Sequence, residues 1–178
     1  MQENKKIYLG VDPGKNGGFA IIYTIDGKVE DVMAKKCGKN AEEMALDMKV
    51  VLKSKKYNQI EGVLELVHSF PGQGVVSMFS FGENYGKWKG VLSTLDINYR
   101  LVRPQEWMKF YNIPKTSKKH RKKHLYDKAA ELFPQLKMTY VIADALLIAN
   151  YCKENEDGLS RPIREKKKRK YSRKNSNR

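Results

Sequence analysis

Two apolar runs joined by a glycine-rich turn, close to the start of the chain, constrain the fold most strongly. Residues 7–11 and 19–23 are rich in Ile, Val, Tyr and Phe, and Pro13 and several glycines separate them. This pattern predicts a β-hairpin. Asp12 directly follows the first run, where a charge is costly unless a cation meets it. The alternative interpretation is a turn aspartate that caps its own backbone.

The next segments extend the hairpin into a larger sheet. An Asp-Gly turn at 26–27 predicts a third strand over residues 28–34, antiparallel to the second. A helix is expected from Asn40 to about residue 56, because Asn40 and Glu43 form a capping box and apolar residues follow at helical spacing.

A short apolar strand is then expected over residues 59–67, with Glu65 near its C-terminal end. A strand that is reached through a helix is expected to run parallel to the first strand. The two C-terminal ends would then lie side by side, with Glu65 near Asp12. A solvent-facing Glu on an edge strand is the alternative.

A helix over residues 75–95 is predicted to have two distinct faces. Apolar side chains recur at alternating steps of three and four, while Gly82, Gly86 and Gly90 recur at steps of four on another face. Each glycine costs about 1 kcal/mol inside a helix, so the ridge indicates a close backbone approach. Its partner is either a second subunit or another part of the same chain.

A strand over 98–102, a short helix over 104–111 and two longer helices over 117–133 and 140–153 complete the expected elements. Trp107 and Phe110 of the short helix and Leu132 of the next helix are expected in the core. The helix at 117–133 begins with a basic cluster. Positive charge opposes the helix dipole there, which favours a contact with an anion. The cluster includes Lys115, Lys118, Lys119, Arg121 and Lys122. The fold class predicted is α/β, with a mixed five-stranded sheet flanked by helices.

Three carboxyl groups interrupt otherwise apolar elements: Asp12, Glu65 and, in the last helix, Asp144. Acids gathered at one place repel one another unless divalent cations neutralise them. Oxygen ligands suit Mg²⁺, with Mn²⁺ as a possible substitute. Carboxylate-held Mg²⁺ pairs clamp phosphates for in-line attack by water, so we expect metal-dependent phosphodiester hydrolysis.

The charge of the chain indicates a polyanionic partner. Its 178 residues carry a net charge of +15, of which +9 lies in residues 161–178 and +6 in the remainder. Nucleic acid is the commonest partner of such a protein. Residues 158–178 are expected to form a disordered basic tail, a DNA tether or a nuclear-import signal. No apolar run has the length of a membrane span, the N-terminus lacks a signal-peptide pattern, and Cys37 and Cys152 are expected to be free thiols, so an intracellular, cytoplasmic location is expected.

Three segments resemble the RuvC-type Holliday junction resolvases of the RNase H-like superfamily, and their phage-type members in particular. They are Gly-Val-Asp-Pro-Gly-Lys-Asn-Gly-Gly-Phe-Ala at 10–20, Leu-Glu-Leu-Val-His-Ser-Phe-Pro-Gly-Gln-Gly at 64–74 and Ala-Asp-Ala-Leu-Leu-Ile-Ala at 143–149. The resemblance implies an RNase H-like nuclease domain over residues 1–157. It also implies a homodimer that makes paired nicks in a four-way DNA junction.

By the same resemblance, Asp12, Glu65 and Asp144 would be the catalytic, metal-binding acids. His68 and Phe70 would contact the junction, and the basic cluster would grip the DNA backbone. One departure stands out: Val141 occupies the position where the family usually carries a fourth metal ligand. Asp127 is a conceivable substitute that its spacing does not support.

Other functions stay open at this point. A degenerate member of the family would hold branched DNA without cutting it, in keeping with Val141. Another RNase H-like nuclease would cut RNA/DNA hybrids or flaps. An Asp-x-Gly hairpin also cradles ATP phosphates in actin-like and hexokinase-like proteins, but those need a second domain that 178 residues do not accommodate.

Overall fold

The computed structural model describes residues 3–54, 56–68 and 72–156 of the chain. Its strands are β1 (Lys5–Val11), β2 (Gly18–Ile25), β3 (Lys28–Lys36), β4 (Gln59–Glu65) and β5 (Asn98–Val102). Its helices are α1 (Ala41–Ser54), α2 (Val75–Thr94), α3 (Pro104–Phe110), α4 (Lys118–Leu132) and α5 (Tyr140–Glu154). Phe70 and the basic tail at 158–178 lie outside the described residues.

The five strands form one mixed sheet in the order β3-β2-β1-β4-β5. β1, β2 and β3 pair antiparallel, whereas β4 is parallel to β1 and β5 is parallel to β4. The antiparallel meander and the parallel β4 are therefore as the sequence predicts. In this register Val11 pairs with Leu64, so the residues that follow them, Asp12 and Glu65, come at the same edge of the sheet.

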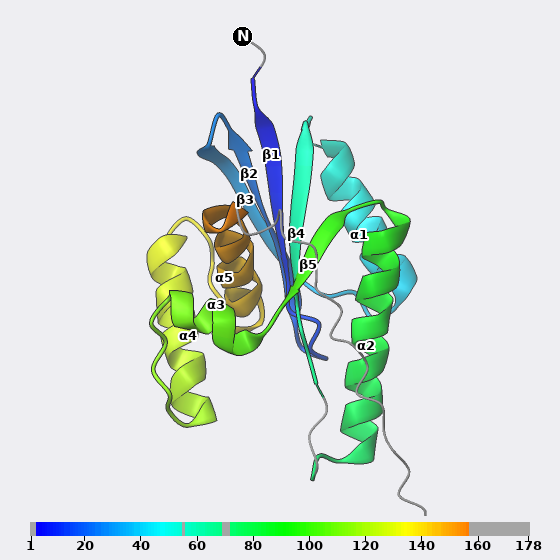
Figure 1. The fold of residues 1–178 in the computed structure, drawn as a ribbon, viewed down its shortest axis with the longest axis vertical. Helices are drawn as coiled ribbons and strands as arrows, with labels where there is room; N and C mark the ends of the chain where they lie inside the picture. Colours follow the sequence, from blue (N-terminus) through cyan, green and yellow to red (C-terminus); the bar gives the residue numbers. More distant parts are fainter. Residues whose placement is uncertain (1–2, 55, 69–71, 157–178) are drawn as a thin grey trace, which may run out of the picture.

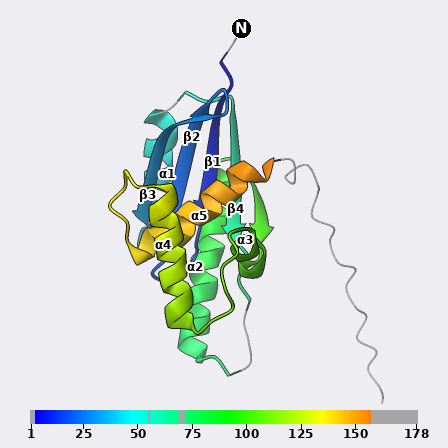
Figure 2. The same cartoon turned by 90° about the vertical axis from the view of Figure 1, so that its left-hand side faces the viewer.

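Helices cover both faces of the sheet (Figure 1). α1 and α2 pack on one face around a core that includes Leu9, Phe19, Met44 and Trp88. α3, α4 and α5 lie on the other face, and α5 crosses the sheet with α4 beside it (Figure 2). Among the described residues, no helix is long and apolar enough to span a membrane.

Local signals in the sequence account for several element boundaries. Asp26 and Gly27 have φ angles of 49° and 79°, as expected for the tight turn between antiparallel strands. At the start of α1, the Asn40 side chain accepts a hydrogen bond from the Glu43 backbone N–H at 2.8 Å. Ser117 caps α4 in the same way, through the backbone N–H of His120.

Burial differs from the sequence-based expectation at two apolar positions. Phe110 and Leu132, expected in the core, are 44% and 38% exposed, and each is the last residue of its helix. An added Cβ at Gly82 would meet nothing within 4 Å, and the same holds for Gly86 and Gly90. The glycine ridge of α2 is therefore not covered by the described part of this chain. Cys37 and Cys152 are free, as predicted, and both are buried.

Gly10 permits the close approach of α5 to the centre of the sheet. A Cβ at this position would lie 2.2 Å from the backbone nitrogen of Ala149 and 2.4 Å from the carbonyl oxygen of Ala145. Both contacts are to helix backbone, which cannot move aside as the end of a side chain can. Any larger residue at position 10 would push α5 away from β1.

Gly10→Ala is therefore expected to lower the free energy of unfolding by about 3 kcal/mol, because it overpacks the contact between α5 and β1. Gly74→Ala is the matched control, since its added methyl group meets open space at a residue with an ordinary backbone conformation; stability should change by less than about 1 kcal/mol. Urea unfolding of both variants measures the difference. Equal stabilities would contradict the close approach of α5 to β1.

A candidate metal centre at the end of the sheet

Three carboxyl groups come together on the α5 side of the sheet. Side chains alternate along strands, and Tyr8 and Val63 point into the core beneath α5 while Val11 and Leu64 point the other way. Asp12 lies four residues after Tyr8, and Glu65 lies two residues after Val63, so both acids are on the α5 side of the sheet. Figure 1 shows α5 beginning at the same end of the sheet.

The tight turn between β1 and β2 fixes the position of Asp12. Its Oδ1 atom accepts a hydrogen bond from the Gly14 backbone N–H at 2.9 Å, so it does cap its own turn. Its backbone N–H donates to the Gly18 carbonyl at 2.9 Å. At Gly17 an added Cβ would lie 2.1 Å from the Asp12 carbonyl oxygen, so only glycine fits there. The two interpretations of Asp12 are thus compatible, because Oδ2 accepts no hydrogen bond from the described residues.

Helix α2 holds the same turn from outside. The Asn84 side-chain amide donates to the carbonyl oxygens of Pro13 and Gly14, each at 3.2 Å. Trp88 donates from Nε1 to Cys37 Sγ at 3.2 Å, and Cys37 Sγ donates in turn to the Asp12 carbonyl oxygen at 3.6 Å. The sequence did not reveal these contacts, because nothing in the spacing of Asn84 distinguishes it from a surface residue.

Trp107 of α3 orients the second acid. Its indole Nε1 donates to Glu65 Oε1 at 3.0 Å, and its ring is fully buried. The sequence correctly predicts that Trp107 is in the core, but carries no signal of this contact with Glu65. Glu65 is the last residue of β4, where it pairs with Val102 of β5, and it is partly buried, so it is not a solvent-facing residue on an edge strand. Its Oε2 and both carboxyl oxygens of Asp144 accept no hydrogen bond from the described residues.

The three carboxyl groups lie within electrostatic range of one another. Burial, followed by the charges of Asp12 and Asp144, raises the pKa of Glu65 to about 8. Burial and the charge of Asp12 raise the pKa of Asp144 to about 7. Burial also raises the pKa of Asp12, against the opposing effects of the Gly14 hydrogen bond and of Lys122.

Two members of the basic cluster face these acids. The charge of Arg121 lowers the pKa of both Glu65 and Asp144, and that of Lys122 lowers the pKa of Asp144 and Asp12. Neither forms an ion pair within 4 Å with an acid of the centre in the described part of the chain. Lys115, Lys118 and Lys119 are exposed around the start of α4.

His68 is exposed just beyond β4, and Val141 is partly buried in the first turn of α5. Asp127 lies on the outer side of α4, where it forms an ion pair with Lys123 at 2.9 Å. Asp127 does not contribute to the pKa shifts of the three acids, so it does not replace the ligand missing at Val141.

The chemistry of the donor set fits a hard divalent cation. The acids supply carboxylate oxygens only, several of them without a hydrogen bond, and a cation between them would remove their mutual repulsion. Within the described residues, no group of three or more His, Cys, Asp or Glu side chains already has the arrangement of a metal site. The assignment of the three acids as metal ligands thus remains a prediction.

The raised pKa values predict that the metal-free protein loses stability with rising pH. A carboxyl group with a higher pKa in the folded state holds its proton more tightly there, so its contribution is lost between about pH 4.5 and pH 8. We expect a loss of about 2–5 kcal/mol over this range in EDTA, measured by urea unfolding.

Glu65→Gln is the matched control, since it keeps an acceptor for Trp107 and cannot ionise. Its stability should fall much less with pH, and Mg²⁺ should stabilise the wild type more than the variant at pH 8. Identical pH profiles for the two proteins would show that Glu65 is not held against other acids.

Comparisons with known proteins identify the fold. No protein-family model and no curated protein sequence match the chain. Among solved structures, it is similar to Thermus thermophilus RuvC in complex with a Holliday junction substrate, with a TM-score of 0.57 and 14% sequence identity over 86% of this chain and 97% of that chain. A second structure of T. thermophilus RuvC matches with a TM-score of 0.54 and 13% identity over the same shares. The chain therefore has a RuvC-like fold of the RNase H-like type.

Proposed function

We propose that this protein is a divalent-metal-dependent endonuclease that resolves four-way DNA junctions by paired nicks. The observation that carries the proposal is the meeting of Asp12, Glu65 and Asp144, from a turn, a strand and a helix, at one end of the sheet. Isolated buried acids occur for structural reasons. Here the charge of Asp12 raises the pKa of both Glu65 and Asp144, and such a group of acids beside a basic helix start is typical of a site for cations and phosphates.

Each acid has a distinct role in this proposal. Asp12, held by the turn and by α2, is within electrostatic range of both other acids, since its charge raises the pKa of each. Glu65 is oriented by Trp107, and Asp144 approaches from α5. Mg²⁺ bound there would stabilise charge on the scissile phosphate and promote in-line attack by water, leaving 5′-phosphate and 3′-hydroxyl ends. Arg121 and Lys122 would hold the neighbouring phosphates.

Branched DNA is the favoured substrate because a RuvC structure with this fold carries a Holliday junction. The net charge of +15 supports a nucleic-acid partner independently of the fold. Exposed lysines at the start of α4 would contact the DNA backbone without regard to sequence: Lys115, Lys118 and Lys119.

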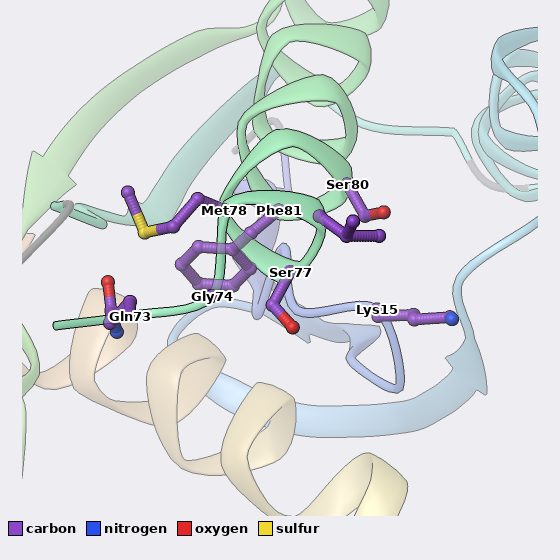
Figure 3. A pocket seen from close by; sticks show the side chains of 8 residues that line it. Lys15, Gln73, Gly74, Ser77, Met78, Ser80 and Phe81 are labelled. Carbon is purple, nitrogen blue, oxygen red and sulfur yellow. The ribbon is translucent and has the colours of Figure 1, made fainter.

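The start of α2 offers a surface for the branch point. Val75, Val76 and Phe79 are 83%, 80% and 73% exposed there, beyond His68 along the chain. A cavity of about 530 Å³ separates these first turns of α2 from the β1–β2 turn, with Lys15 on one side and Ser77 and Phe81 on the other (Figure 3). Apolar side chains beside a cation suit unpaired bases and their phosphates.

We further propose that the protein acts as a homodimer, since two opposed strands must be cut. The glycine ridge of α2 has open space around it and lies on the helix that holds the Asp12 turn. The three glycines would allow the backbone of a second copy to pack closely against α2.

One observation favours a second candidate, a protein that binds branched DNA without cutting it. Val141 is apolar where the related nucleases usually carry a fourth ligand, and Asp127 is paired elsewhere. Three acids with water or phosphate oxygens completing the coordination suffice for the proposed reaction, whereas weak binding of a second cation would abolish it. Cleavage assays decide between the two candidates.

Asp12→Asn is expected to lower Mg²⁺-dependent nicking of a synthetic four-way junction by about a hundredfold or more, with junction binding in EDTA retained. Trp107→Phe keeps an aromatic side chain, smaller than the indole, but loses the hydrogen bond to Glu65, so it should lower the rate by about 10–100-fold. The assay uses both Mg²⁺ and Mn²⁺, and includes flap and RNA/DNA hybrid substrates.

The outcomes separate the candidates. Junction binding without nicking in either metal would favour the binding-only protein, and preferential cutting of hybrids or flaps would favour another nuclease. Undiminished nicking by Asp12→Asn would refute the proposed site.

A further inference from the structure

A second groove lies next to the acidic centre, between α3 and the start of α4. Its volume is about 690 Å³, within the range of pockets that take small organic groups. Arg121 lines this α3–α4 groove and is also within electrostatic range of Glu65 and Asp144. Arg121 therefore links the groove to the place where the scissile phosphate would lie, although none of the three acids lines it.

The walls of the α3–α4 groove combine an apolar floor with a cationic rim. Met108 and Ile113 are partly buried, pack against the core beneath α5 and supply the floor, to which Pro114 adds an exposed apolar side chain. Lys109 and Lys115 join Arg121 on the rim. An apolar surface bordered by positive charge matches a nucleotide, which has an apolar aromatic face and an anionic phosphate.

Two carboxamides stand at the groove with their hydrogen-bonding groups available. Gln105 and Asn112 are exposed, and the side chain of neither makes a hydrogen bond within the part of the chain that the structure describes. A carboxamide both donates and accepts, so it can pair with the edge of a base. The apolar floor, the cationic rim and the two carboxamides thus match three parts of a nucleotide: the face of the base, the phosphate and the edge of the base.

The groove is formed by backbone that is held in place. The backbone N–H groups of Asn112 and Ile113 donate to the carbonyls of Lys109 and Met108, each at 3.0 Å. Tyr111, which directly precedes Asn112, donates from its hydroxyl to the Leu147 carbonyl of α5 at 2.8 Å. The wall of the groove is therefore tied to the helix that carries Asp144, so its distance from the acidic centre is fixed.

We propose that the α3–α4 groove takes one unstacked nucleotide of the DNA strand that is being cut, next to the scissile phosphate. The base lies on the floor with its edge at Gln105 and Asn112, and its phosphate meets the rim. A base inside a duplex hides its faces in the stack, so the floor selects a nucleotide that the branch point has released. Cleavage then depends on the identity of the base that the groove holds. This inference rests on the proposed function, because it requires that a DNA strand reach the acids.

The test uses synthetic four-way junctions with 2-aminopurine placed at successive positions around the branch point. Binding of the full-length protein in EDTA should raise the fluorescence of the probe several-fold at one position, because the base leaves the stack. Asn112→Gly removes the carboxamide and tolerates the φ of 54° at this position. It should reduce that signal and leave the other positions unchanged.

Asp96→Gly is the matched control, because Asp96 is exposed, has a φ of 53° and precedes β5 at the opposite end of the sheet. It should behave as the wild type. In Mg²⁺, sequencing of the cut sites on junctions of random sequence should show about tenfold preference for one base in the wild type, lost in Asn112→Gly but kept in the control.

The combined results identify which proposal fails. Nicked junctions whose fluorescence and base preference are the same in Asn112→Gly and Asp96→Gly would overturn the groove and leave the nuclease standing. A fluorescence change that depends on Asn112, without nicking in Mg²⁺ or Mn²⁺, would support the groove and overturn the nuclease. Failure to bind branched DNA would overturn both.

Discussion

The contact between α5 and the middle of the sheet is the interaction on which the candidate site depends. Gly10 is the position that allows it, since any side chain there would meet the backbone of Ala145 and Ala149. Because α5 lies so close to β1, Asp144 reaches the edge where Asp12 and Glu65 end their strands. The core beneath α5 supplies the hydrophobic free energy that holds this arrangement together. The site is thus a consequence of packing that the rest of the domain stabilises.

That packing leaves the acidic centre under electrostatic strain. Burial and mutual repulsion raise the pKa of Glu65 and Asp144 to about 8 and 7, so without a cation the centre opposes folding at neutral pH. Arg121 and Lys122 relieve part of this cost from a distance but form no ion pair with the acids within the described residues. Such an arrangement lowers the stability of the metal-free protein but favours the binding of a cation together with a phosphate. This supports a functional role for the three acids.

The three acids could be predicted from the sequence because a general structural rule applies to each of them. A crossover through a helix makes β4 parallel to β1, which brings Glu65 to Asp12, and an acid in the apolar run of α5 needs a partner. Contacts between distant residues could not be predicted in this way. The spacing of Trp107 indicates burial but not its hydrogen bond to Glu65, and Asn84 carries no local signal of its contact with the Asp12 turn. The α3–α4 groove likewise depends on how Tyr111 docks on α5, a feature without periodicity.

The central claim is that Asp12, Glu65 and Asp144 share a divalent cation. Anomalous diffraction from crystals of the full-length protein grown with Mn²⁺ tests it most directly, because Mn²⁺ scatters anomalously and accepts the same oxygen ligands as Mg²⁺. We expect at least one peak at about 2.0–2.3 Å from oxygen atoms of all three acids, and its loss in crystals of the Asp144→Asn variant. Well-ordered crystals in which Mn²⁺ occupies other sites and leaves these three carboxyl groups without a peak would contradict the claim.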